Sequence, residues 1–396
     1  MKSDPRHEKV QSLLKLANWS IQDHTKTALT ESLGVAVRDY PLARDYGKID
    51  YLLFLEGKAV GLIELQNTTQ TKDTPPKLQG LATEAPKYSR GLPFTLRLFT
   101  RPLPFLYQSR GSANSFTNIF DPHPKPRHLI GFHRPETLRG WLEDGMVGET
   151  PRDMAAEHFP EHRRRGRSFQ ERIMINMPKL STEGLSPEQH KAISNTERSL
   201  SENRMSALIE LRSSKERAVP MIRMIERLLK FADARRVLVL VHTEKAAQKL
   251  KVDLRTQISC IDGLPFTEAF PLQHLKENLV SDSRLCIAKL SDLHNLLGNQ
   301  ETSKKETPLQ YNSAFPIETF EVVILESCDV SLTKRVQTTL RYFDAYLIGF
   351  TQKVSQETAD FFDQNLVMRY KKPETSALSE GLNVIVSDFS SCNGRS

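Results

Sequence analysis

The stretch Ile49-Asp50-Tyr51-Leu52-Leu53-Phe54-Leu55-Glu56-Gly57-Lys58-Ala59-Val60-Gly61-Leu62-Ile63-Glu64-Leu65 decides the fold of the first part of the chain. Two apolar runs flank a short turn with glycine at its centre, and this pattern predicts a β-hairpin. The runs are nearly continuous in apolar residues, which is typical of strands buried on both faces. With Gly57 as the pivot, the expected cross-strand pairs are Phe54 with Val60, Leu52 with Leu62, and Asp50 with Glu64.

The pairing of Asp50 with Glu64 predicts a metal site. Directly opposed Cβ atoms lie roughly 5 Å apart, and like charges in this position destabilise the sheet. A divalent cation shared through carboxylate oxygens removes that repulsion. Gln66 follows on the same face because side chains in a strand alternate with a period of two. The alternative is two solvated acids at the open end of a hairpin. An acid followed by an acid-x-polar tripeptide on the next strand resembles the active-site layout of the PD-(D/E)xK nucleases.

Composition narrows the class of protein. The 396 residues allow two or three domains, and the net charge of +7 favours a polyanionic partner. The four cysteines have no CxxC or Cys/His ligand spacing, so neither disulfides nor zinc are expected. The segment Met1–Pro5 has no apolar core, and no apolar run approaches the roughly 18 residues of a membrane span. A cytoplasmic protein without membrane contact is expected.

The first part of the chain, residues 1–145, is predicted as one domain. A helix over Gln22–Leu33 and a strand at Val35–Tyr40 are expected before the hairpin, within a mixed sheet between helices. Residues 146–180 form a predicted basic linker, in which charge is dense and periodicity fades. Its arginines are either a solvated face or a phosphate-contacting patch, since arginine binds phosphate well. The candidate DNA-binding residues are Arg163, Arg164, Arg165 and Arg167.

Residues 181–372 are predicted as a second domain, followed by a loose tail over 373–396. Short apolar segments alternate here with helical stretches, which predicts a parallel sheet with helices on both faces. The expected strands are Ala207–Leu211, Val237–Val241, Leu285–Ala288, Val322–Leu325 and Ala345–Ile348.

Longer strings carry a family resemblance along nearly the whole chain. The chain resembles the amino-terminal part of the restriction (motor) subunit of type I restriction–modification enzymes. The hairpin is similar to that family's nuclease hairpin, and the later strings to the end of its first RecA-like motor domain. The other matching strings are Leu103–Tyr107, Phe116–Asn118, Phe132–Leu138, Tyr342–Gly349 and Phe361–Met368.

The resemblance implies an α/β fold: a PD-(D/E)xK-like nuclease domain followed by one degenerate RecA-like (superfamily 2 helicase) domain. The catalytic residues would be Asp50, Glu64 and Gln66, with Mg²⁺ held by the two acids. The family has lysine where this chain has Gln66, so nuclease activity is in question. The family's Gln-x-x-x-Tyr motif reads Glu84-Ala85-Pro86-Lys87-Tyr88, where proline would disturb a helix interior.

The motor motifs depart further from the family. A P-loop needs glycines, a lysine and a Ser/Thr hydroxyl to hold phosphates and Mg²⁺. In the matching stretch Arg217 stands for the lysine and Ala218 for the hydroxyl, with Ser214 and Glu216 in place of glycines. The Asp-Glu-x-His box reads Glu326-Ser327-Cys328-Asp329, and Thr-Ala-Thr-Pro reads Thr351-Gln352-Lys353-Val354. Gln189 matches the adenine-reading glutamine. ATP binding and ATP-driven translocation are therefore not expected.

These residues predict a DNA-binding, restriction-subunit-like protein of a phage-defence or mobile-element context. Its residual chemistry, if any, would be Mg²⁺-dependent endonuclease activity on DNA. The alternative is a non-catalytic interaction protein that docks in a restriction–modification complex, or acts as a decoy for it. A third reading is a nonfunctional remnant of a decaying gene. The expected partners are duplex DNA and the modification and specificity subunits of such a complex.

Overall fold

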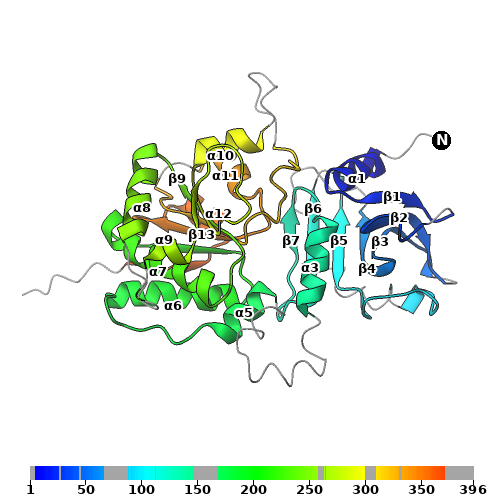
Figure 1. The fold of residues 1–396 in the computed structure, drawn as a ribbon, viewed down its shortest axis with the longest axis horizontal. Helices are drawn as coiled ribbons and strands as arrows, with labels where there is room; N and C mark the ends of the chain where they lie inside the picture. Colours follow the sequence, from blue (N-terminus) through cyan, green and yellow to red (C-terminus); the bar gives the residue numbers. More distant parts are fainter. Residues whose placement is uncertain are drawn as a thin grey trace, which may run out of the picture.

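A computed structural model describes residues 5–25, 28–43, 46–66, 88, 90–111, 113–145, 168–256, 263, 265–298, 309–329 and 332–370. Within these ranges the chain forms two lobes, each built on a seven-stranded sheet. In Figure 1 the amino-terminal lobe, blue to cyan, lies to the right of the second lobe, green to orange.

The first sheet is mixed, and its strands follow one another in chain order. Strands β2 to β4 form an antiparallel meander, β5 returns parallel to β4, and β5 to β7 are antiparallel. Apolar residues of α1 (Pro5–Leu16) and α3 (Pro135–Gly145) pack on one face. The strands are β1 (Ser20–Asp23), β2 (Gly34–Pro41), β3 (Lys48–Leu55), β4 (Lys58–Leu65), β5 (Phe105–Ser109), β6 (Asn114–Asn118) and β7 (Arg127–Leu129).

The hairpin between β3 and β4 has the predicted register at its open end and a different one near the turn. Leu52 pairs with Leu62, as expected, but Phe54 pairs with Ala59 rather than with Val60. The register shifts between Leu53 and Phe54 because a β-bulge inserts one extra residue into β4. The pairing of Tyr51 with Ile63 is unaffected. One further step along this register places Asp50 opposite Glu64.

The helix predicted over Gln22–Leu33 is wrong. Gln22 lies in β1, which pairs in parallel with β2, and residues 28–33 form turns and bends. The Gln22 amide supports the turn, because its Nε2 donates to the Ala28 carbonyl and its Oε1 accepts from the Ala28 N–H at 2.7 Å. Strand pairing together with this local bonding overrides the weak helical pattern. The helix of this region is α1, which precedes it.

The second sheet is entirely parallel, in the order β10-β11-β9-β12-β13-β8-β14. It confirms the predicted α/β class of this part of the chain, and each predicted strand overlaps an observed one. The strands are β8 (Ser206–Glu210), β9 (Val237–Val241), β10 (Leu272–His274), β11 (Leu285–Lys289), β12 (Val322–Leu325), β13 (Tyr346–Thr351) and β14 (Leu366–Met368).

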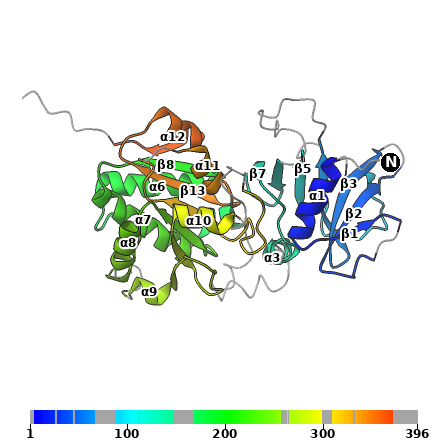
Figure 2. The same cartoon turned by 90° about the horizontal axis from the view of Figure 1, so that it is seen from above.

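Helices cover both faces of this parallel sheet, as the alternation of segments predicts (Figure 2). One face packs against helices α5 to α9, and the other against α10 to α12. Helix α5 lies within the stretch predicted as linker, and its Phe169 and Ile173 belong to the core of the second lobe. The helices are α5 (Phe169–Asn176), α6 (Pro187–Ser201), α7 (Ser214–Lys230), α8 (Glu244–Thr256), α9 (Phe266–Ala269), α10 (Leu290–Leu297), α11 (Lys334–Leu340) and α12 (Gln356–Phe361).

The two lobes share one hydrophobic core. A single cluster of buried apolar residues runs from α1 and the first sheet to the α10–α12 face of the second sheet. At the junction, Gly131 has no room for a side chain, because a Cβ there would lie 2.3 Å from the Tyr311 ring. Glu318 accepts hydrogen bonds from the Arg134 backbone N–H, the Arg134 Nε and the Thr137 hydroxyl. The lobes therefore pack as one body.

Candidate functional site

Three acids lie side by side on neighbouring strands of the first sheet. Pairs on either side of Asp39, Arg38 with Tyr51 and Tyr40 with Ile49, place Asp39 opposite Asp50. The hairpin register places Asp50 opposite Glu64 on the next strand. Asp39 has a φ of 52°, a left-handed conformation that interrupts the regular pairing of β2. The sheet thus brings together Asp39, Asp50 and Glu64, of which the sequence predicted only the last two.

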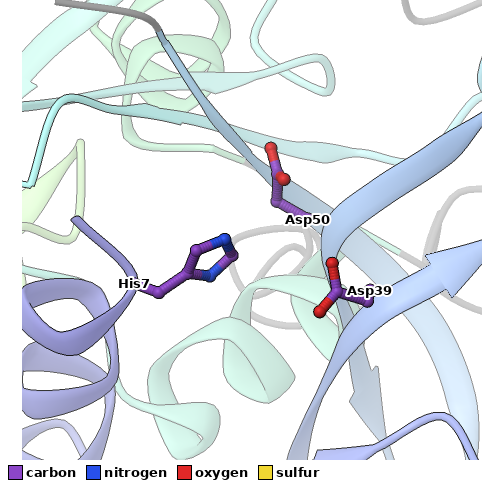
Figure 3. Close-up of side chains that lie close together, drawn as sticks. All are labelled: His7, Asp39 and Asp50. Atoms are coloured by element: carbon purple, nitrogen blue, oxygen red, sulfur yellow. The ribbon is translucent and has the colours of Figure 1, made fainter. Parts of the chain in front are cut away.

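A histidine from outside the sheet completes a possible ligand set (Figure 3). His7 of α1 offers a ring nitrogen, and Asp39 and Asp50 each offer a carboxylate oxygen, all within 4.8 Å of one another. The His7 Nδ1 lies 2.9 Å from the Tyr51 hydroxyl, which fixes the orientation of the ring. Burial raises the pKa of Tyr51 to about 12, so this hydroxyl keeps its proton at neutral pH. Such a hydrogen bond to the second ring nitrogen is common in histidines that bind metal.

Cations and backbone groups partly satisfy the two aspartates. The Asp39 carboxylate pairs with the Lys48 ammonium and lies 3.3 Å from the Arg38 Nε. The hydrogen bond to Asp39 raises the pKa of Lys48. The Asp50 Oδ2 accepts a hydrogen bond from the Leu65 backbone N–H at 2.7 Å. A metal ion at this position would compete with Lys48 for Asp39.

Glu64 and Gln66 are held by other partners. The Tyr88 hydroxyl donates to the Glu64 carboxylate. The Gln66 side-chain oxygen accepts from the Arg110 Nε at 3.3 Å, and its backbone carbonyl accepts from the Arg6 guanidinium at 2.9 Å. A cation shared by Asp50 and Glu64 remains a prediction from the sequence. The acid that joins Asp50 in the three-residue ligand set is Asp39.

The donor set at this site fits a divalent cation that accepts nitrogen ligands. Two carboxylates supply the oxygen atoms that Mg²⁺ and Mn²⁺ require. The imidazole of His7 suits transition metals better than Mg²⁺, which binds almost entirely through oxygen and keeps several waters. The residues that could hold the metal are therefore His7, Asp39 and Asp50, with Glu64 on the neighbouring strand.

The segments that the resemblance matched to motor motifs meet at one edge of the second sheet. The segments that follow β8, β12 and β13 lie together because the parallel strands end at the same edge. In proteins of this architecture ligands bind outside the carboxyl ends of the strands. The Arg217 Nη1 donates to the Asp329 Oδ2 at 2.9 Å, and Asp329 Oδ1 accepts from the Thr351 hydroxyl and the Gln352 N–H. The ion pair and the hydrogen bonds to Asp329 thus connect all three segments.

In this ion pair the arginine side chain is buried and the aspartate side chain is partly exposed. The Arg217 side chain is 4% exposed, while Asp329 is 29% exposed. Burial raises the pKa of the Asp329 carboxyl, but hydrogen bonds from Gln352, Ser327 and Thr351 and the charge of Arg217 outweigh it, so the pKa lies below its ordinary value. The Ser327 hydroxyl donates to the same carboxylate at 2.8 Å. Ser327 is therefore a structural partner of Asp329.

Ala218 and Glu326, which the resemblance also matched to motor motifs, lie against other parts of the second lobe. Ala218 lines a hollow of about 350 Å³ between α7 and α8, together with Lys215, Arg223 and Lys249. The Glu326 backbone N–H donates to the Leu240 carbonyl, which continues the pairing beyond β12. The stretch that the resemblance matched to a P-loop has no glycine between Leu211 and Ala218, and α7 begins within it at Ser214.

The resemblance matched Gln189 to an adenine-reading residue. Both the oxygen and the nitrogen of its side-chain amide form hydrogen bonds within the protein. Its Oε1 accepts from the Ser186 N–H, which completes a capping box at the start of α6. Its Nε2 donates to the Glu216 carbonyl at 3.0 Å. Pro220, four residues further along α7, has no N–H for that carbonyl, so Gln189 supplies the missing donor.

Sequence reasoning missed two of the residues gathered at Asp50. His7 gave no signal because α1 was not predicted, and Asp39 lies in a strand whose pairing partner the pattern did not identify. The alternation of side chains assigns each residue of Val35–Tyr40 to a face of the strand, but the level of Asp39 beside Asp50 depends on the register of β2 with β3. The predicted DNA-binding residues Arg163, Arg164, Arg165 and Arg167 lie outside the described residues.

Among the described helices, none combines the length and the apolar character that crossing a membrane requires.

No protein-family model matches the chain, and no curated protein matches it. Among solved structures it is similar to a fragment described as an HsdR subunit of a type I restriction enzyme from Vibrio vulnificus YJ016, with 14% identity and a TM-score of 0.32. That match covers 90% of this chain and 57% of the fragment.

Two helicases are similar at the same level. The Hef helicase domain from Pyrococcus furiosus has 14% identity and a TM-score of 0.31, covering 46% of this chain and 37% of that one. The UvsW helicase from bacteriophage T4 has 15% identity and a TM-score of 0.29, covering 57% of this chain and 77% of that one. At these identities and TM-scores, none of the three structures assigns a family to this chain.

Proposed function

We propose that the chain is a DNA-binding, restriction-subunit-like protein with a metal-dependent nuclease site and an inactive motor site. The observation that carries the proposal is the convergence of His7, Asp39 and Asp50, whose ligand atoms lie within 4.8 Å of one another beside the hairpin. Two parts of the first lobe carry these residues: helix α1 holds His7, and the antiparallel meander holds Asp39 in β2 and Asp50 in β3. The net charge of +7 favours a polyanionic substrate.

Each side chain at this site has a different proposed role. When bound, a divalent cation would supply Lewis-acid stabilisation of the charge that develops on a phosphate group. Asp39 and Asp50 would hold the cation through oxygen, and His7 through a ring nitrogen oriented by Tyr51. Gln66 can position a water molecule by hydrogen bonding but cannot remove its proton. Slow strand cleavage is the expected activity.

A nicking assay on supercoiled plasmid tests this function. We expect wild-type protein to produce open-circular DNA, with Mn²⁺ more effective than Mg²⁺ because of the imidazole. Asp50→Ala and His7→Ala should abolish the Mn²⁺-dependent product, while His24→Ala, which changes a partly exposed histidine on the same lobe, should not. Equal nicking by wild type and Asp50→Ala would refute the assignment.

DNA binding is proposed to include contacts from the basic stretch that holds Arg163, Arg164, Arg165 and Arg167. Each phosphate neutralised releases counterions, so log affinity for duplex DNA falls linearly with log salt concentration. Three or four contacts would give a slope of about −3. Replacing all four arginines with alanine should flatten this slope by a similar amount for any sequence. An unchanged slope would show that the stretch is only a solvated linker.

The motor site is proposed to bind no nucleotide usefully. Arg217, Ser327, Thr351 and Gln352 all bond to Asp329, and a bound nucleotide would have to break this network. Calorimetry should therefore detect no ATP affinity in the micromolar range. DNA-stimulated phosphate release above background would contradict this expectation.

A second candidate is a non-catalytic protein that docks in a restriction–modification complex or acts as a decoy for it. The observation that favours it is the satisfied state of both sites: Lys48 already neutralises Asp39, and Arg217 already neutralises Asp329. This candidate predicts copurification with modification and specificity subunits. It also predicts the same yield of complex with wild-type protein and with Asp50→Ala.

A further inference from the structure

We propose that the loop Leu92–Arg101 binds single-stranded DNA by stacking Phe94 on an unpaired base. Phe94 is 95% exposed, whereas every other large apolar side chain described as exposed shows 57% or less. Exposing a whole aromatic ring to water is unfavourable by the hydrophobic effect. The whole face of the ring is therefore accessible to a ligand.

The loop holds Phe94 outward on a fixed backbone. Leu92 is buried in the core beneath the first sheet, and Leu96 and Leu98 pack against the same core. The Ala43 N–H donates to the Gly91 carbonyl at 2.7 Å, and the Ala59 N–H donates to the Arg97 carbonyl at 2.8 Å. Phe94 thus projects between two anchored points, which lowers the entropy cost of presenting it to a ligand.

The charge of the loop matches a polyanion. From Tyr88 to Arg101 the sequence contains Arg90, Arg97 and Arg101 and no acidic residue, and all three arginines are exposed. The Arg101 guanidinium lies 5.5 Å from the centre of the Phe94 ring. An aromatic face beside arginines is the arrangement by which proteins bind single strands, where bases stack and backbone phosphates pair with cations.

A single strand fits this surface better than a duplex or a protein. The bases of a duplex are already stacked on one another and offer no free face to a side chain. A stable protein interface needs roughly 800 Å² on each partner with an apolar centre. On this loop the exposed neighbours of Phe94 are Thr95, Arg97 and Arg101. One aromatic ring among cations is too small a centre for such an interface.

The loop also adjoins the acidic site. It begins beside Tyr88, whose hydroxyl donates to Glu64, and Leu98 forms a bridge with Ala59 at the other end of β4. The inference goes beyond the proposed nuclease function, because stacking on Phe94 requires neither a metal nor cleavage.

Fluorescence anisotropy with a labelled oligo-dT strand and a matched duplex tests the proposal, without divalent metal. Phe94→Ala should weaken single-strand binding by about 5- to 150-fold, which corresponds to about 1 to 3 kcal/mol for one stacked base. Phe94→Leu should lose nearly as much, since it keeps apolar area but no aromatic face. Phe94→Trp should restore binding, and Thr95→Ala should leave it unchanged.

Two further readouts separate stacking from charge and from misfolding. Phe94→Ala should leave the salt dependence unchanged, whereas Arg97→Ala with Arg101→Ala should reduce its slope by about 1.4. The oligonucleotide should quench the indole emission of Phe94→Trp. Melting temperatures should match, because Phe94 makes little contact with the core.

Three outcomes would overturn the proposal. The first is Phe94→Ala and Phe94→Leu binding the single strand as wild type does. The second is an equal loss of single-strand and duplex affinity, which would indicate a general effect on DNA binding. The third is a wild-type dimer that Phe94→Ala converts to a monomer in light scattering, which would make this loop a protein contact. A failed nicking assay would leave the stacking proposal standing, since no cleavage is involved.

Discussion

At the scale of single residues, the acids of the first sheet give the most direct test of metal binding. Asp39 and Asp50 oppose one another across β2 and β3, and Lys48 and Arg38 offset only part of the repulsion between the two carboxylates when no metal is bound. We expect Asp50→Asn to melt at the same temperature as wild type or higher without metal, and to lose the rise that Mn²⁺ causes in wild type. Thermal melts with and without Mn²⁺ measure this.

Lys48→Met should strengthen Mn²⁺ binding at the site that Asp50→Asn weakens. It removes the ammonium that competes for Asp39, so Mn²⁺ should bind about 1.5- to 5-fold more tightly, the range that follows from an exposed ion pair of about 0.2 to 1 kcal/mol. If wild type, Asp50→Asn and Lys48→Met respond identically to Mn²⁺, the cluster does not bind metal.

A buried carboxylate at the junction of the lobes makes stability depend on pH. Asp344 lies 3.1 Å from the Arg127 Nε and 3.0 Å from the His133 Nε2, with Asp121 on the far side of Arg127. Burial raises the pKa of Asp344, but the charge of Arg127 and the hydrogen bond from His133 outweigh it, so the pKa lies below 3.8. The resulting stability is present above pH 3.8 and is lost as the pH falls through the folded-state pKa.

Asp344→Asn should therefore cost about 3 to 5 kcal/mol at neutral pH, because it removes one partner of a buried pair. Urea unfolding of wild type and Asp344→Asn at a series of pH values measures the difference, which should shrink below pH 3.8 as wild-type Asp344 gains a proton. Asp121 acts in the opposite sense, since burial raises its pKa, and it is common to both proteins. A difference that stays constant down to pH 3 would show that the charge of Asp344 contributes nothing.

At the scale of secondary-structure elements, a proline inside α7 explains the role of Gln189. Pro220 leaves the Glu216 carbonyl without its helical donor, and the Gln189 Nε2 fills that place at 3.0 Å. Gln189→Ala should destabilise the protein by about 0.5 to 1.5 kcal/mol, the usual net contribution of one hydrogen bond, since this bond is only partly buried. In a Pro220→Ala background, where residue 220 supplies an N–H, the same change should cost clearly less.

A double-mutant cycle from urea unfolding gives the coupling between the two positions. Additive effects would contradict the structural role of Gln189. Nucleotide recognition by Gln189 would instead appear as an ATP-dependent shift in the wild-type melt that Gln189→Ala removes.

At the scale of the whole molecule, the shared core predicts one cooperative unfolding transition. Trp19 and Trp141 both belong to the first lobe, while Cys286 and Cys328 are buried in the second, and all four contact the same core cluster. In a variant with Cys260 and Cys392 changed to serine, tryptophan emission and thiol labelling should change at the same urea concentration. Two separate midpoints would show that the lobes unfold independently.

Glu318→Ala should move both curves together. Glu318 accepts three hydrogen bonds at the junction, so we expect a loss of about 1.5 to 3 kcal/mol. Glu321→Ala, which removes an acid that pairs with Arg172 within the second lobe, is the matched comparison. A shift of only the thiol curve in Glu318→Ala would contradict the shared core.

The sequence by itself determined the hairpin, most strands of the second lobe and the class of that lobe. Hairpin turn chemistry and apolar runs depend on neighbouring residues, so they predicted both the pairing of Leu52 with Leu62 and the bounds of the strand Val237–Val241. The match of Arg217 and Ala218 to P-loop positions is what the family resemblance implies, and it stays a prediction. The sequence did not predict the bulge in β4, because the position of the extra residue is set only when β3 and β4 pair.

Only the tertiary structure decided which distant residues meet. His7 reaches Asp50 because α1 packs on the first sheet, and a sequence pattern contains no such contact. Gln189 bonds to Glu216 and Arg217 to Asp329 for the same reason. The local sequence pattern predicts which side chains are buried. The chemical role of a buried polar group depends on its partner, which is set by the packing of other elements.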